Sequence, residues 1–169
     1  MSAINSMLLA LWMASASVDT GRPASLDFLK GAWQLFDATG QPVGTSCVWI
    51  ENGFVSEVRR DRDGDLPVWF YQSESNSGWT QLFPGPSGAL REFLPLSKPG
   101  VWPMVLGNQF TLKDGRKADF RLTLKTLAGR NSRRTLEMST DGKASWSTVF
   151  DFEYRSIHET GSSGCNQKH

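Results

Sequence analysis

Apolar residues recur at every second position through most of the chain between residues 32 and 155. In the stretch ADFRLTLKT, Phe120, Leu122 and Leu124 fall on one side of an extended chain, and polar residues fall on the other. A helix would distribute the same residues around its circumference. The pattern therefore predicts a strand with one face in the protein core.

A longer stretch near the C-terminus, ASWSTVFDFEYR, repeats this alternation. Strict period two places five mostly aromatic residues on one face of the predicted strand: Trp146, Thr148, Phe150, Phe152 and Tyr154. The other face carries the more polar residues. This strand is expected to present its aromatic side to the interior.

Turn signals separate the alternating segments. Four dipeptides accept positive φ angles and are typical of tight hairpins: Asn52-Gly53, Asp63-Gly64, Asp114-Gly115 and Asp141-Gly142. Consecutive strands are therefore expected to be antiparallel. They are predicted near residues 32–37, 44–51, 54–60, 66–73, 79–83, 89–94, 105–112, 117–126, 133–139 and 145–155, after a short helical turn near 25–30.

The number of strands favours a closed sheet. An open sheet of this length would leave two rows of unpaired backbone groups, which closure removes. The sequence thus predicts an all-β protein in which residues 26–157 form a single antiparallel meander barrel of about 8–10 strands. A two-sheet sandwich is the alternative. A barrel of this size encloses either its own side chains or one small ligand.

Two short motifs carry a resemblance to a known family. Gly-Ala-Trp at residues 31–33 follows the helical turn, and STDGKASWSTVFDFEYR ends the last strand. Together they resemble lipocalin-like (calycin) barrels, and in particular a family of uncharacterised, often exported bacterial proteins. The resemblance implies that Trp33 plugs the closed end and that Arg155 lies over it. Alternation puts Arg155 opposite Phe150 and Phe152, so this arrangement needs a bulge at the strand end. In the alternative, Trp33 is an ordinary core residue and Arg155 a solvated charge.

The N-terminal residues resemble an export signal. MLLALWM at residues 7–13 is apolar but too short to span a bilayer, and Ala-Ser-Ala at 14–16 fits a signal peptidase site. No Lys or Arg precedes the apolar run, so an N-terminus that stays attached is the alternative. We expect a signal peptide at 1–16, a flexible segment at 17–25 and a periplasmic or secreted product with no stable membrane insertion.

The chain has two cysteines, Cys47 and Cys165. In an oxidising compartment they are able to pair in a disulfide. In the alternative interpretation Cys47 is a half-buried strand residue, and Cys165 belongs to a disordered tail at 158–169. The sequence leaves both interpretations open.

The aromatic residues suggest a binding role. They form 11% of the chain, more ring area than a small barrel needs for packing alone, which favours a pocket for a small hydrophobic or amphipathic ligand. The candidate ligand-binding residues lie on the predicted strands: Trp49, Trp69, Tyr71, Phe120, Leu122, Trp146, Phe150 and Phe152. Rings that point outward would instead favour a structural or protein-interaction domain.

Charge and histidine content argue against other functions. The 18 basic and 17 acidic side chains nearly cancel, so no net field draws the protein to nucleic acid. Both histidines, His158 and His169, follow the last predicted strand, where a catalytic triad or metal site is hard to build. No catalytic residue, metal ligand or cofactor is assigned. An unrecognised enzyme is the third alternative, with four strand carboxylates as its available acids and bases: Glu92, Glu137, Asp151 and Glu153.

Alternating acidic residues occur in RRDRDGDLP, at Asp61, Asp63 and Asp65. Carboxylates at this spacing suit calcium, but the interleaved arginines repel a cation. The sequence favours a charged hairpin tip at this position.

A basic cluster occurs in GRNSRR, at Arg130, Arg133 and Arg134. Guanidinium groups bind phosphate or carboxylate in a bidentate manner. A short basic cluster in a turn is more often solvated, and this is the favoured interpretation.

Overall fold

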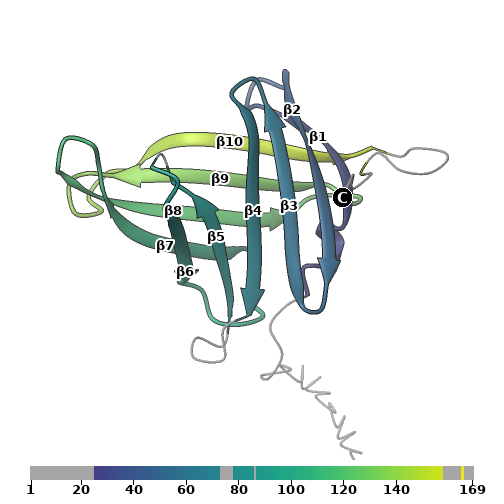
Figure 1. Ribbon diagram of the computed structural model, residues 1–169, viewed down its shortest axis with the longest axis horizontal. Helices are drawn as coiled ribbons and strands as arrows, with labels where there is room; N and C mark the ends of the chain where they lie inside the picture. Colours follow the sequence, from purple (N-terminus) through teal and green to yellow (C-terminus); the bar gives the residue numbers. More distant parts are fainter. Residues whose placement is uncertain (1–24, 73–77, 86, 158–164, 166–169) are drawn as a thin grey trace, which may run out of the picture.

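Ten antiparallel strands form a closed barrel in the computed structural model, which describes residues 25–72, 78–85, 87–157 and 165 (Figure 1). The strands are β1 (Gly31–Phe36), β2 (Pro42–Glu51), β3 (Phe54–Asp61), β4 (Gly64–Gln72), β5 (Trp79–Pro84), β6 (Leu90–Pro95), β7 (Met104–Thr111), β8 (Lys117–Thr126), β9 (Ser132–Ser139) and β10 (Ser147–Ser156). A 3-10 turn, η1 (Asp27–Leu29), precedes β1. The prediction of an all-β meander barrel is confirmed.

The barrel closes through the pairing of its first and last strands. Each strand pairs with its neighbour in sequence, and β1 also pairs with β10, from Trp33 opposite Ser156 to Phe36 opposite Glu153. This pairing leaves no open sheet edge, so the sandwich alternative is excluded. Residues opposite each other in these ladders share a face, which sorts every strand side chain into the interior or the exterior.

Local backbone chemistry explains where the strands begin and turn. Asn52 and Gly53 have φ angles of 49° and 82°, the pair of positive values that a tight type I′ hairpin between β2 and β3 requires. Gly31 has a φ of 131°, which side-chain-bearing residues rarely adopt. The glycine of the Gly-Ala-Trp motif therefore lets the chain leave η1 and enter β1.

Trp33 lies in the core beside η1. It is 1% exposed, and its Nε1 donates a hydrogen bond of 2.7 Å to the carbonyl oxygen of Leu29. Its ring meets the ring of Tyr154 edge-on, with 6.5 Å between centroids. Leu26 and Leu29 belong to the same buried cluster. Residues of η1, β1 and β10 thus pack together around the indole.

Arg155 does not lie over Trp33. It is exposed, it pairs with Gln34 on the outer face, and its guanidinium lies 4.0 Å from the centroid of the Phe36 ring. Its Nε also donates to Glu153 at 2.9 Å. The prediction of an Arg155 contact over Trp33 is wrong, because β10 keeps its alternation to the end and has no bulge there.

Cys47 and Cys165 form a disulfide, with 5.4 Å between their Cα atoms. Cys47 lies on β2 between the buried Ser46 and Val48, so the bond is on the outer face. The indole Nε1 of Trp49 donates to the carbonyl oxygen of Cys165 at 3.3 Å. The alternative of two unpaired cysteines is thereby excluded.

The predictions for the N-terminal residues 1–24 and for the rest of the tail lie outside the described residues. Among the residues that the structure does describe, no helix has the length and apolar character needed to cross a membrane.

We expect Trp33→Ala to lower the free energy of unfolding by about 3–5 kcal/mol, because it removes a large buried ring. Arg155→Ala, on the outer face, should cost about 1 kcal/mol or less. The two losses should add in the double variant, since the side chains do not touch. Urea unfolding of the four proteins measures this. A loss in the double variant well below the sum would contradict the observed placement of Arg155.

Candidate functional site

A cavity of about 100 Å³ lies inside the barrel. Its walls are mostly apolar, with three polar side chains among them: Arg59, Leu66, Val68, Gln81, Phe83, Phe93, Leu122, Arg134, Leu136 and Phe150. One water needs roughly 10–15 Å³ of such space. The cavity therefore has room for several waters or a small organic molecule.

Strand registry explains why these side chains meet. Leu122 of β8 lies opposite Leu136 of β9, which lies opposite Phe150 of β10, so the three form one row on the inner face. A second row runs through Gln81 of β5 and Phe93 of β6. Neighbouring strands thus present apolar side chains to a shared interior, and the cavity is a product of the closed sheet.

A buried charged cluster lies within the barrel. Glu57 and Arg134 are 1% and 4% exposed, and Arg134 Nη1 donates to Glu57 Oε2. Ser46 Oγ donates to the other carboxylate oxygen, Oε1, at 2.7 Å. The pair links β3 with β9, which are not neighbours in the sheet. A buried charge that loses its partner is strongly destabilising, so the two residues depend on each other.

Tyr154 and Arg134 influence each other's ionisation. The guanidinium of Arg134 lies 4.4 Å from the centroid of the Tyr154 ring. Burial, assisted by the charge of Glu57, raises the pKa of Tyr154 to about 12. Burial opposes the charge of Arg134, but Glu57 and Tyr154 outweigh it and raise the pKa of Arg134 above its usual value. At neutral pH the charged guanidinium of Arg134 therefore lies beside a neutral tyrosine.

Several buried polar atoms around the cavity lack a partner. Among the described residues, none hydrogen-bonds to Nε of Arg59, to Nε and Nη2 of Arg134, or to Oε1 of Gln81. All three residues line the cavity. Buried polar groups in folded proteins are normally hydrogen-bonded, so these atoms lack the partners that such groups usually have.

Arg59 is held mainly by aromatic rings. Its Cζ lies 5.1 Å from the centroid of Phe150 and 5.3 Å from that of Phe152, within the range of a cation–π contact. Its Nε is 3.7 Å from the Asp61 carboxylate, which is longer than a hydrogen bond. The guanidinium is thus positioned by packing, while its hydrogen-bonding capacity stays partly unused.

Aromatic rings continue from the cavity along β7 and β8. Phe93 and Phe110 meet edge-on at 5.6 Å, and Phe110 and Phe120 lie 5.5 Å apart. The guanidinium of Arg91 lies 4.9 Å from the centroid of Phe110. Phe110 and Phe120 are only half-buried, whereas Trp33 and Tyr154 are buried. The barrel interior is therefore more accessible to solvent near Phe110 and Phe120.

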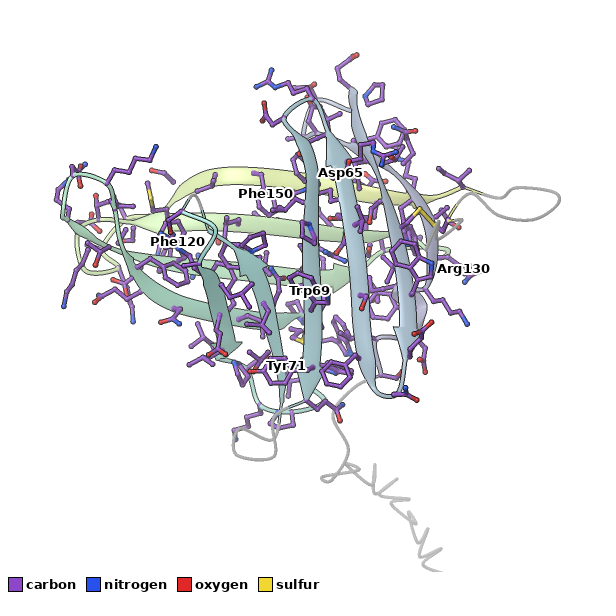
Figure 2. The ribbon with its side chains drawn as sticks, viewed as in Figure 1. Asp65, Trp69, Tyr71, Phe120, Arg130 and Phe150 are labelled. Carbon is purple, nitrogen blue, oxygen red and sulfur yellow. A yellow bond between two sulfur atoms is a disulfide. The ribbon has the colours of Figure 1, made fainter. Side chains whose placement is uncertain are left out.

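Four of the predicted ligand-binding residues belong to the inner face. Leu122 and Phe150 line the cavity, Phe152 contacts Arg59, and Phe120 joins the neighbouring ring cluster. Figure 2 labels Phe120 and Phe150 on the strands that carry them. Two of the four thus line the cavity itself, and the other two lie next to it on the inner face.

Trp49, Trp69 and Tyr71 lie on the outer face, so their placement in a binding interior is wrong. Trp69 and Tyr71, labelled in Figure 2, alternate with the buried Val68 and Phe70 on β4. Trp49 shares a row with Trp69 through β3. Because β4 is apolar on both faces, the sequence alternation did not reveal which set faces inward.

Trp146 is also outside the barrel, for a different reason. The β9–β10 register shifts between Thr148 and Phe150, a bulge that reverses the facing of even-numbered residues. Trp146 lies before the bulge, and the guanidinium of the outward Arg121 is 4.3 Å from its ring centroid. Strict period two had placed Trp146 and Phe150 together.

Sequence reasoning missed the polar residues of the interior. Glu57 and Arg59 alternate in step with the buried Val55 on β3, and this shared period was the available signal. The sequence groups Arg134 with Arg130 and Arg133 in a basic turn. The structure separates them, because Arg133 is on the outer face and bonds Asp151 at 2.6 Å.

The carboxylates considered for catalysis lie outside the barrel and have partners. Glu137 bonds Arg121 at 2.9 Å, Asp151 bonds Arg133, Glu153 bonds Arg155 and Glu92 accepts from Tyr71 at 3.2 Å. Arg133 also lowers the pKa of Asp151 below its usual value. These pairs are structural contacts of neighbouring strands.

The acidic hairpin and a second hollow offer little room for a ligand. Asp65 accepts two hydrogen bonds from Arg60. Over the described residues, no group of three or more His, Cys, Asp and Glu side chains is arranged to hold a metal.

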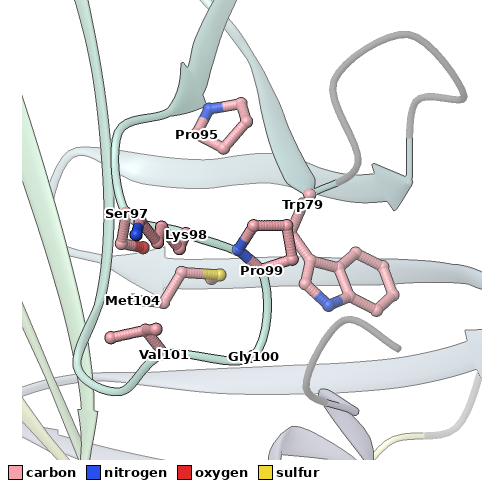
Figure 3. A pocket seen from close by; sticks show the side chains of 9 residues that line it. Trp79, Pro95, Ser97, Lys98, Pro99, Gly100, Val101 and Met104 are labelled. Carbon is pink, nitrogen blue, oxygen red and sulfur yellow. The ribbon is translucent and has the colours of Figure 1, made fainter. Parts of the chain in front are cut away.

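The second hollow, beside the loop before β7, has a volume of about 20 Å³ (Figure 3). Trp79 and Pro99 help to line it, and it has room for about one water.

The chain matches no family model, no curated protein and no solved structure. The closed ten-stranded meander is consistent with a lipocalin-like fold.

We expect Glu57→Gln to lower the free energy of unfolding by about 3–5 kcal/mol, because it leaves the Arg134 charge buried without a counter-ion. Glu153→Gln, which breaks a more exposed pair on β10, is the matched control and should cost about 0–1 kcal/mol. The double variant Glu57→Leu/Arg134→Met should recover most of the loss, since it removes both charges. Urea unfolding tests this, and equal costs for the two glutamine variants would contradict it.

Proposed function

We propose that the barrel binds one small hydrophobic or amphipathic molecule in its interior and performs no chemistry on it. The cavity of about 100 Å³ inside the closed sheet is the observation that carries this proposal. Its apolar wall, from Leu122, Leu136, Phe83 and Phe150, suits the body of such a molecule. An engineered apolar cavity of about 150 Å³ accommodates benzene, so a slender chain of a few carbons fits this volume best.

The outward aromatic residues give less support to an interaction domain. Trp49 hydrogen-bonds to Cys165, Trp146 lies under Arg121, and Tyr71 stacks on Phe54 with 6.4 Å between centroids. Their contacts within the chain account for these rings. The enzyme alternative relied on strand carboxylates, but the four considered lie outside the barrel, and both oxygens of the buried Glu57 already accept hydrogen bonds.

We also propose that the protein is exported to the periplasm or medium. The apolar run at residues 7–13, the Ala-Ser-Ala site and the resemblance to exported lipocalin-like proteins support this. The disulfide adds support, because such bonds persist in oxidising compartments.

Expression of the full chain in a bacterium tests the export proposal. N-terminal sequencing should find a product that begins at residue 17 outside the cytoplasm. Its mass should not change on alkylation without reductant, because Cys47 and Cys165 are paired. An intact Met1 on a cytosolic product would overturn the proposal.

Ligand binding is tested by calorimetric titration with two six-carbon probes, hexanoate and 1-hexanol. We expect one saturable site at micromolar to millimolar concentration, or about −8 to −4 kcal/mol. Phe150→Trp should fill the cavity and weaken binding while the protein stays folded; in a solid core the same change would cost about 1–3 kcal/mol of stability.

Val149→Trp provides the matched control. Val149 is 51% exposed, so this substitution adds the same ring outside the barrel. This variant should bind both probes as the wild type does. The absence of saturable binding by either probe, with a destabilised Phe150→Trp, would favour a barrel filled by its own side chains.

A further inference from the structure

The cavity contains more unused hydrogen-bond donors than acceptors. Arg134 is 4% exposed, and only its Nη1 has a partner, so Nε and Nη2 are left over. Arg59 leaves its Nε unpaired. Gln81 Oε1 is the unpaired acceptor among the residues that line the cavity. A bound group that mainly accepts hydrogen bonds would satisfy this set.

The nearby carboxylates do not supply the missing acceptors. Both oxygens of Glu57 already receive a hydrogen bond, one from Ser46 and one from Arg134. The Asp61 carboxylate is 3.7 Å from Arg59 Nε, beyond hydrogen-bond distance. The unused N–H groups of the two arginines therefore have no acceptor among the described residues.

The charges on the inner face also favour an anion. In the described strands, the register places three basic residues on the inner face: Arg59, Arg91 and Arg134. It places two acidic residues there, Glu57 and Asp61. Three positive and two negative charges leave a net charge of +1 on the inner face, and Arg91 contributes from the more solvent-accessible region beside Phe110. A neutral polar group would leave this charge uncompensated.

We propose that the ligand of this barrel carries an anionic group, in the simplest case a carboxylate, which Arg59 and Arg134 bind together. The apolar part then lies along Phe83, Leu136 and Phe150, which line the same cavity. Guanidinium groups suit this role because they offer several donors to one carboxylate. The inference rests on the proposed function and adds the chemical class of the ligand.

Three probes of equal chain length test the head group: hexanoate, 1-hexanol and hexylammonium, titrated calorimetrically at pH 7 into the oxidised protein. Hexanoate should bind at least tenfold more tightly than 1-hexanol, and hexylammonium should not bind. Equal affinities for hexanoate and 1-hexanol would overturn the anion inference and leave the proposed function intact. Binding of none of the three would overturn both.

Substitution of Arg59 tests whether this residue binds the anionic group. Arg59→Met should weaken hexanoate at least tenfold and 1-hexanol much less, because it removes the charge but keeps an apolar side chain in the cavity wall. Arg60→Met is the matched control, since Arg60 is on the outer face and paired with Asp65. An equal effect of the two variants, or no effect of Arg59→Met, would contradict a direct role for Arg59.

Arg134→Lys tests the second arginine without leaving Glu57 unpaired, because the lysine keeps one charge beside that carboxylate. The variant should lose most of the preference for hexanoate over 1-hexanol. Circular dichroism and urea unfolding establish that it is folded. A folded variant with the wild-type preference would overturn the role of Arg134.

Discussion

The pairing of β1 with β10 is the constraint on which the rest of the molecule depends. It leaves the sheet without a free edge and gives every strand a definite inner face. Interior space, the row of Leu122, Leu136 and Phe150, and the isolation of Glu57 and Arg134 from solvent all follow from this closure. An open sheet would expose the charged pair to water and remove the cavity. The cavity and its buried charged pair therefore depend on a single inter-strand ladder.

The strands themselves could be predicted from the sequence because their cause is local. Alternation such as that of Phe120 and Leu122, with Asn52-Gly53 at a turn, acts over a few residues and fixes strand positions and antiparallel order. Which side chains of each strand face the interior was less predictable. On β4 both Trp69 and Phe70 are apolar, and only the curvature of the closed sheet selects Phe70 for the interior. One bulge in β10 reverses which residues face inward, so Trp146, just before the strand, points outward. The sequence alternates regularly through this segment and does not reveal the bulge.

The polar half of the candidate site could not be predicted for another reason. Glu57 and Arg134 are 77 residues apart, and neither has a local pattern that names the other. Arg134 follows Arg133 directly, so composition groups the two, although strand geometry sends one to the exterior and the other into the barrel. A charge on an otherwise apolar face, as at Arg59, is the feature of a sequence that signals such a site. Its chemistry becomes clear only when the opposite strands are in place.

The disulfide also changes what a single cut in the backbone does to this molecule. The covalent loop from Cys47 to Cys165 spans 118 residues and contains every turn from that between β2 and β3 onward. A protease that cleaves one of those turns leaves both fragments joined through sulfur, so the barrel strands stay in one molecule. Separation of the fragments then needs a reductant as well as a protease. In an oxidising environment rich in proteases, the bond thus preserves the continuity of a nicked chain.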